Sequence, residues 1–174
     1  MFGNYYSSKY LIIVDLLQEN GKKISSTDIR RLILNGNMEG VKSLLGRNYS
    51  ITGKVLHGKR LGNQKQAPTI NISFAPNMLI PAYGVYITKT VIKNKIYNSI
   101  SNVGIRPSVE ITDKPNIETN IFDFNDDIYD ECVTIEFLKM IRPEIKFSNT
   151  NELFKQIHKD ISYAKHYFIG ENNG

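Results

Sequence analysis

Residues 83–103 read YGVYITKTVIKNKIYNSISNV, and this stretch decides the fold class. Apolar and polar side chains alternate along both halves, and a period of two residues is typical of β-strands. Turn-forming residues at 93–95 separate the halves, so the stretch predicts an antiparallel hairpin.

Four more segments show short alternating runs with turn residues between them. They are residues 50–57, 69–74, 116–124 and 132–141. With the hairpin they make six predicted strands, and no helical segment intervenes. Closely spaced strands of this kind predict a small antiparallel barrel, which we expect to start near Arg47.

Helices are expected on both sides of the barrel. In residues 1–46, apolar residues recur at helical spacing over 10–18, a capped helix follows residues 24–28, and a short helix over 38–45 ends at Gly46. Residues 149–168 carry an amphipathic stripe that predicts a final packing helix. The chain is thus predicted to be mainly β with flanking helices, divided into residues 1–46 and a barrel domain over 47–170.

Composition limits the class of protein. The chain has 174 residues and one cysteine, Cys132, so no internal disulfide can form and a reducing compartment is expected. Cys132 lies in a predicted strand without a basic neighbour and is expected to be a buried, inert thiol. No apolar run reaches the roughly 20 residues of a membrane helix, and the first residues do not resemble a signal peptide. We therefore expect a cytoplasmic protein.

Charge is distributed unevenly. Residues 1–105 carry a net charge of +10, residues 106–174 carry −5, and no acidic residue lies between Glu39 and Glu110. A basic half points to a phosphate or polyanion partner, although a solvated surface gives the same pattern.

Three weak chemical signals follow one another. Gly53, Gly58 and Gly62 lead into a basic loop that could cradle a phosphate or simply connect two strands. Thr69 and Asn71 project from one face of a strand and offer the oxygen ligands that Mg²⁺ prefers, or they face solvent. Glu118 lies in a later apolar strand, where a carboxylate could accept a hydroxyl proton or face water.

In combination, the motifs resemble the riboflavin kinase domain of bacterial bifunctional riboflavin kinase/FAD synthetases. The resemblance covers about 120 residues, from 45 to 165. The residues that carry it are Leu45-Gly46-Arg47-x-Tyr49, Gly53-x-Val55-x-His57-Gly58, Pro68-Thr69-Ile70-Asn71-Ile72, Pro81-x-x-Gly84-Val85-Tyr86, Asn102-Val103-Gly104-Ile105-Arg106-Pro107-Ser108, Glu118-Thr119-x-Ile121-x-Asp123-Phe124 and Ile141-Arg142-Pro143-Glu144-x-Lys146-Phe147.

The resemblance implies a six-stranded, Greek-key-like barrel with a C-terminal helix, and transfer of the ATP γ-phosphate to riboflavin to give FMN. It implies that Thr69 and Asn71 hold Mg²⁺ and that Glu118 is the catalytic base. By the same resemblance, the nucleotide is covered by Gly53, Val55, His57, Gly58, Gly62 and Lys65. The flavin is bordered by Arg142 and Phe147.

Residues 24–30 resemble the closing motif of the FMN adenylyltransferase domain that precedes the kinase in these proteins. That domain's histidine phosphate motif does not occur here, since the only histidines are His57, His158 and His166. We therefore expect no FAD synthesis by this chain alone.

Two other functions stay open from the sequence. The glycine loop departs from the family pattern at Asn63, Lys65, Gln66 and Ala67, which would suit a flavin-binding relative without catalysis. The basic half, with ten Tyr and eight Phe, would suit a barrel that binds single-stranded nucleic acid.

Overall fold

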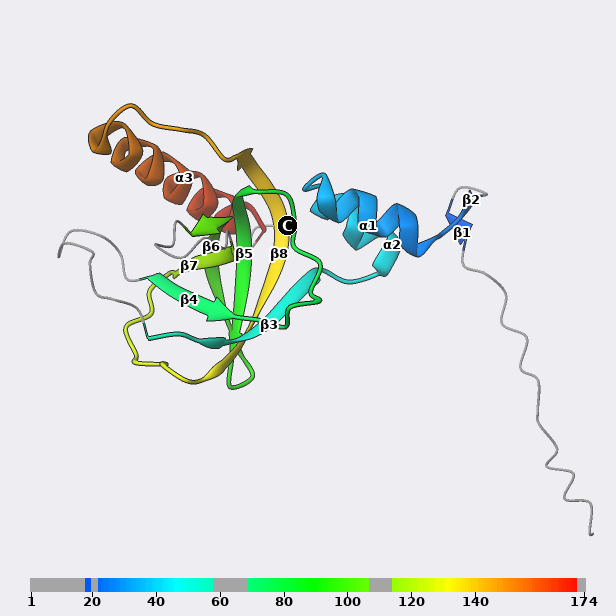
Figure 1. Cartoon of the computed structure of the whole chain (residues 1–174), viewed down its shortest axis with the longest axis horizontal. Coiled ribbons are helices and arrows are strands. Elements are labelled where there is room, and N and C mark those ends of the chain that lie inside the picture. Colours follow the sequence, from blue (N-terminus) through cyan, green and yellow to red (C-terminus); the bar gives the residue numbers. More distant parts are fainter. Residues whose placement is uncertain (1–17, 20–21, 58–68, 107–113, 172–174) are drawn as a thin grey trace, which may run out of the picture.

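The computed structural model describes residues 18–19, 22–57, 69–106 and 114–171, and it confirms the six-stranded antiparallel barrel. The strands close in the order β3-β4-β7-β6-β5-β8 (Figure 1). Their bounds are β3 Tyr49–Val55, β4 Thr69–Ser73, β5 Gly84–Ile92, β6 Lys95–Arg106, β7 Lys114–Ile121 and β8 Cys132–Pro143.

Alternation along the strands explains why the barrel closes. Ile51 and Val55 of β3 and Ile135 and Phe137 of β8 are at most 1% exposed and fill the interior. The predicted hairpin is β5–β6, with Ile92 opposite Lys95. Its turn is two residues long, and both have positive φ (47° at Lys93, 66° at Asn94), the geometry that matches the twist of paired strands.

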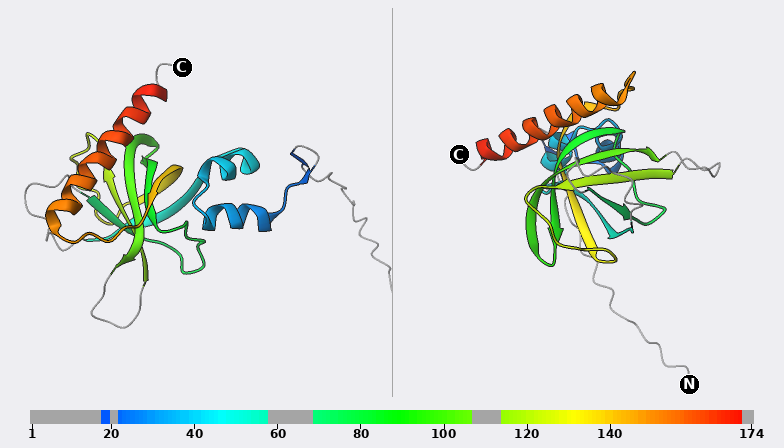
Figure 2. Two further views of the ribbon diagram at one scale, coloured as in Figure 1. Left: turned by 90° about the horizontal axis from the view of Figure 1, so that it is seen from above. Right: turned by 90° about the vertical axis from the view of Figure 1, so that its left-hand side faces the viewer.

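The predicted C-terminal helix is α3, Thr150–Glu171, and it lies along the outside of the barrel (Figure 2). Ala164 and Phe168 are buried against Val85, Ile87 and Leu138, which point outward from β5 and β8. No helix in the described part of the chain is long and apolar enough to cross a membrane.

One ion pair fastens α3 to the barrel. Asp160, 4% exposed, accepts hydrogen bonds from Arg142 Nε (3.0 Å) and Nη2 (2.8 Å) on β8. Gln156 Nε2 donates to the other carboxylate oxygen at 2.8 Å. A buried ion pair becomes costly when one partner is removed, because the remaining charge stays out of water.

The predicted helices before the barrel are α1, Ser26–Leu34, and α2, Met38–Leu45. Ser25 caps α1 by accepting from Asp28 N, and Gly46 ends α2 with a left-handed φ of 68°. Ile33, Met38 and Val41 belong to the same buried cluster as the barrel interior. The expected boundary near residue 46 therefore falls between elements that share a core.

Three expectations differ from the structure. Gln18–Glu19 form a short strand, β1, paired with β2, Lys22–Lys23, so the helix expected over 10–18 does not reach Gln18; residues 10–17 lie outside the described residues. Strand β7 ends at Ile121, before Asp123 turns with a φ of 54°. Cys132 is exposed, because β8 points Val133 inward and its neighbour outward.

We expect Asp160→Asn to destabilise the protein by about 3 kcal/mol, since Arg142 would keep a buried charge without its counter-ion. Urea unfolding followed by circular dichroism measures the loss. Glu39→Gln is the matched control, because its ion pair with Lys139 (3.1 Å) is exposed and should contribute little. Equal stability of the two variants would contradict the conclusion that the Arg142–Asp160 ion pair holds α3 on the barrel.

Candidate active site

The pairing of β4 with β7 brings two of the predicted chemical signals together. Asn71 lies opposite Glu118 in the antiparallel ladder, and Thr69 lies opposite Asn120. Thr69 Oγ1 donates a hydrogen bond of 2.6 Å to Glu118 Oε1, although the two residues are 49 positions apart. A hydroxyl, an amide and a carboxylate therefore meet on the outer face of two adjacent strands.

Asn71 has a second polar neighbour that the sequence analysis missed. Asn116 Nδ2 donates to Asn71 Oδ1 at 2.9 Å. An amide oxygen has two lone pairs, so Asn71 Oδ1 can accept from Asn116 and still ligate a cation. Asn116 lies two residues before Glu118 on the same strand. Because side chains alternate with a period of two, the sequence could have placed Asn116 on the same face as Glu118.

The donors suit magnesium more than a transition metal. Within the described residues, no group of three or more His, Cys, Asp or Glu could hold a metal ion. Thr69 Oγ1, Asn71 Oδ1 and the Glu118 carboxylate are all oxygen donors. Mg²⁺ prefers such ligands and normally shares its shell with water and substrate phosphates.

A continuous row of paired residues runs around the barrel from this site. Asn71 lies opposite Glu118, Glu118 opposite Asn102, Asn102 opposite Val85, and Val85 opposite Arg142. Adjacent strands are about 4.8 Å apart, so roughly 14 Å of surface separates the backbones of Glu118 and Arg142. Glu118, the predicted base, and Arg142, predicted to border the flavin, therefore lie in one row of paired residues but are not in contact.

The two residues predicted to border the flavin lie together. The Arg142 guanidinium stands over the Phe147 ring, 5.8 Å from its centre, as well as binding Asp160. The Arg142 side chain is 17% exposed, because Asp160 and α3 cover it. Arg142 thus fastens the last helix and packs on Phe147 in the segment that precedes it.

The residues predicted to cover the nucleotide fall into three groups. Gly53 is inside β3, where an added Cβ would overlap the Ser73 carbonyl oxygen of β4. Val55 is 1% exposed, so its side chain belongs to the core and is not available to a ligand. His57 follows β3 and is exposed. The remaining three, Gly58, Gly62 and Lys65, lie outside the described residues.

His57 belongs to a charged cluster that the sequence analysis also missed. Its Nε2 lies 2.8 Å from Asp130 Oδ2, and Lys54 Nζ lies 2.9 Å from Asp130 Oδ1. The His57 ring stacks on Tyr129, with 4.6 Å between ring centres. Hydrogen bonds from Lys54 and His57 lower the pKa of the Asp130 carboxyl. In the sequence, Asp130 is one of several acidic residues after residue 110, and no motif distinguishes it from the others.

Residues 45–168 match the family model described as "Flavokinase: Riboflavin kinase". The chain belongs to the riboflavin kinase family. The match covers all six strands of the barrel and most of α3, and it includes the Thr69, Asn71 and Glu118 cluster.

The curated relatives are longer proteins of the same family. The chain is 39% identical over 158 residues to the bifunctional riboflavin kinase/FMN adenylyltransferase of Bacillus subtilis, covering 90% of this chain and 50% of that protein. It is 40% identical over 168 residues to the protein of that name from Buchnera aphidicola subsp. Schizaphis graminum, covering 95% and 54%. The chain thus spans about half the length of the curated relatives it matches.

Two solved structures share the fold. One is described as a macrolide-efflux protein from Streptococcus pneumoniae, with a TM-score of 0.78, 35% identity, and coverage of 88% of this chain and 50% of that one. The other is riboflavin kinase from Trypanosoma brucei, with a TM-score of 0.50, 21% identity, and coverage of 70% and 80%. At that identity, the second likeness concerns the fold alone.

We expect Gly53→Ala to cost about 1–3 kcal/mol of stability, because the new methyl group must push β3 away from β4. Thermal or urea unfolding measures this loss without any ligand. Gly170→Ala is the control, since an added Cβ there meets nothing within 4 Å. Unchanged stability of the Gly53 variant would contradict the close strand contact.

Proposed function

We propose that this chain transfers the γ-phosphoryl group of ATP to the 5′-hydroxyl of riboflavin, giving FMN and ADP. The supporting observation is the hydrogen bond of 2.6 Å between Thr69 Oγ1 and Glu118 Oε1, which sets a carboxylate beside a hydroxyl and an amide oxygen. Membership of the riboflavin kinase family supports the choice of substrates. The proposal concerns this phosphoryl transfer alone.

In the proposed reaction, Glu118 is the general base. Its carboxylate accepts the proton of the riboflavin 5′-hydroxyl as that oxygen forms a bond to the γ-phosphorus. The bond between the γ-phosphorus and the bridging oxygen breaks, and ADP leaves with the electron pair. An ionised carboxylate has about four acceptor sites, so Glu118 can hold Thr69 and the substrate hydroxyl together. In phosphoryl transfer, positioning and charge neutralisation supply most of the catalysis.

Thr69 and Asn71 are the proposed ligands of a magnesium ion that accompanies ATP. The Thr69 hydroxyl donates a hydrogen bond to Glu118 and keeps its lone pairs for a cation. Asn116 holds the Asn71 amide with its oxygen toward the same face. Bound Mg²⁺ would neutralise phosphate charge during the transfer.

We propose that the flavin lies between Glu118 and the Arg142–Phe147 pair, over the part of the paired row that α3 leaves uncovered, since Val85 in the row is buried against α3. The roughly 14 Å between the ends of this row leaves length for a ribityl chain and a ring system. Phe147 is half-buried and offers an apolar surface at the far end, held there by Arg142. Because ATP is a cytoplasmic substrate, we also propose that the protein works in the cytoplasm.

The described structure gives little support to nucleic-acid binding. Tyr49, Tyr86 and Phe137 pack against one another inside the barrel, and Phe122 packs on Phe168 beneath α3. These rings are therefore not available to stack on bases. A flavin-binding relative without catalysis remains an outcome of the experiment below.

We expect purified protein with riboflavin and Mg-ATP to form FMN, and we expect Glu118→Gln to lower kcat by about 10²–10⁴-fold, the usual contribution of a general base. Chromatographic separation of FMN measures the rate. Glu136→Gln is the matched control, because this glutamate also lies on a barrel strand but binds Asn48 (3.2 Å).

Two results would contradict the proposal. If wild-type protein quenches riboflavin fluorescence but forms no FMN at any ATP concentration, the chain binds flavin without catalysis. If Glu118→Gln keeps the wild-type kcat, another group accepts the proton.

A further inference from the structure

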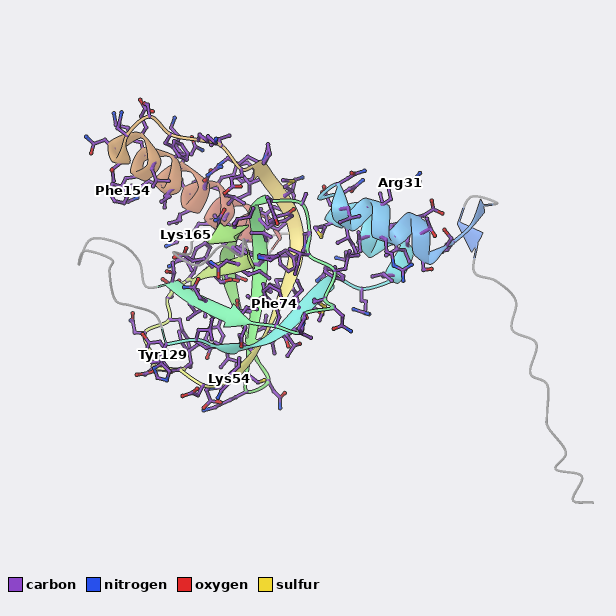
Figure 3. The ribbon with its side chains drawn as sticks, in the orientation of Figure 1. Arg31, Lys54, Phe74, Tyr129, Phe154 and Lys165 are labelled. Atoms are coloured by element: carbon purple, nitrogen blue, oxygen red, sulfur yellow. The ribbon has the colours of Figure 1, made fainter. Side chains whose placement is uncertain are left out.

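Asp130 binds two nitrogen-bearing side chains at one end of the barrel. Its carboxylate contacts Lys54 Nζ at 2.9 Å and His57 Nε2 at 2.8 Å, and the adjacent Tyr129 stacks on the His57 ring. Figure 3 shows Lys54 and Tyr129 at the same end of the barrel, away from Arg31 and the helix pair. We call Lys54, His57, Tyr129 and Asp130 the Asp130 cluster.

Stability does not explain the Asp130 cluster. The side chains of Lys54, His57 and Asp130 are 56%, 68% and 60% exposed, and ion pairs in water contribute little to folding. Asp130 also has a φ of 65°, in the left-handed region that favours glycine. Asp tolerates this region better than most residues do, and its carboxylate is the group of this turn that contacts Lys54 and His57.

The backbone ties the cluster to the candidate active site. Asp130 N donates to Val55 O at 3.1 Å, and Val55 N donates to Glu131 O at 2.9 Å, which extends the pairing of β3 with the segment before β8. On the other side, Leu56 N donates to Asn71 O at 2.8 Å. Leu56 is thus bonded to Asn71, a proposed magnesium ligand, and His57 directly follows Leu56 in the chain.

Within the proposed function, we propose that Asp130 is a positioning residue for the nucleotide. It holds the Lys54 and His57 side chains together at the end of β3, the strand that pairs with Asn71 through Leu56, so that both side chains are already ordered when the ATP phosphates bind. Preordering saves the entropy of fixing side chains on binding, and it affects nucleotide affinity, not the chemical step.

The test compares steady-state kinetics of variants at about 0.15 M salt, where charges more than about 8 Å apart are largely screened. We expect Asp130→Gly to raise KM for ATP roughly two- to fivefold, with kcat and KM for riboflavin unchanged. The melting temperature should stay near the wild-type value. We expect His57→Gln to raise KM for ATP too, and the double variant to be no worse than the worse single one.

Two controls separate ordering from other effects. Glu131→Gln removes the same charge one residue away, where the carboxylate binds Lys93 at 2.8 Å, and should not raise KM for ATP. Asn94→Gly relieves a positive φ of 66° in the β5–β6 turn and should also leave KM unchanged.

An unchanged KM for ATP in Asp130→Gly, or an equal rise in Glu131→Gln, would overturn the positioning role. If wild-type protein forms no FMN, the proposed function fails separately. Calorimetric titration of the same variants with a non-hydrolysable Mg-ATP analogue then decides the inference. A larger dissociation constant for Asp130→Gly than for wild type supports the positioning role, and an unchanged constant overturns it.

Discussion

The antiparallel pairing of β4 with β7 is the constraint on which the candidate site depends. It sets Asn71 opposite Glu118 and lets Thr69 Oγ1 reach the Glu118 carboxylate. A slip of one residue would turn Glu118 into the barrel and Thr119, which is fully buried, out to solvent. The contacts of the candidate site therefore require a barrel whose register is fixed on both sides of each strand.

The rest of the fold keeps that register in place. Inside the barrel, Ser101 on β6 bonds Thr119 on β7 at 2.8 Å, in the register pair next to the outward pair of Asn102 and Glu118. Outside, the buried pair of Arg142 and Asp160 holds α3 against β8. The site thus lies on a surface that is braced from within by strand pairing and from one side by a helix.

Local patterns in the sequence were sufficient for the barrel. Alternation predicted the six strands, and Gly46 marked the end of α2. The same alternation, applied more strictly, would have placed Cys132 outside, because Val133, Ile135 and Phe137 point inward. The failure at Gln18 has another cause, since a two-residue strand has too few positions for a periodic signal.

The chemistry could be predicted only in part. Thr69, Asn71 and Glu118 were singled out by residue type and by resemblance, but their contact depends on a pairing between segments 49 residues apart. Asn116 and Asp130 could not be singled out, because their contacts are with residues far away along the chain. Val55 was predicted to cover the nucleotide from its place in a motif, and that motif gave no sign that its side chain fills the core.

We propose that the outer face of β4 and β7 binds a metal–nucleotide complex. Paramagnetic broadening of nuclear magnetic resonance signals by Mn²⁺-ADP tests it most directly. We predict that the side-chain amide of Asn71 and the backbone amides of Thr69 and Glu118 broaden first, while Asn94 in the β5–β6 turn stays sharp. Unbroadened signals from β4 and β7, with broadening elsewhere on the barrel, would contradict the account.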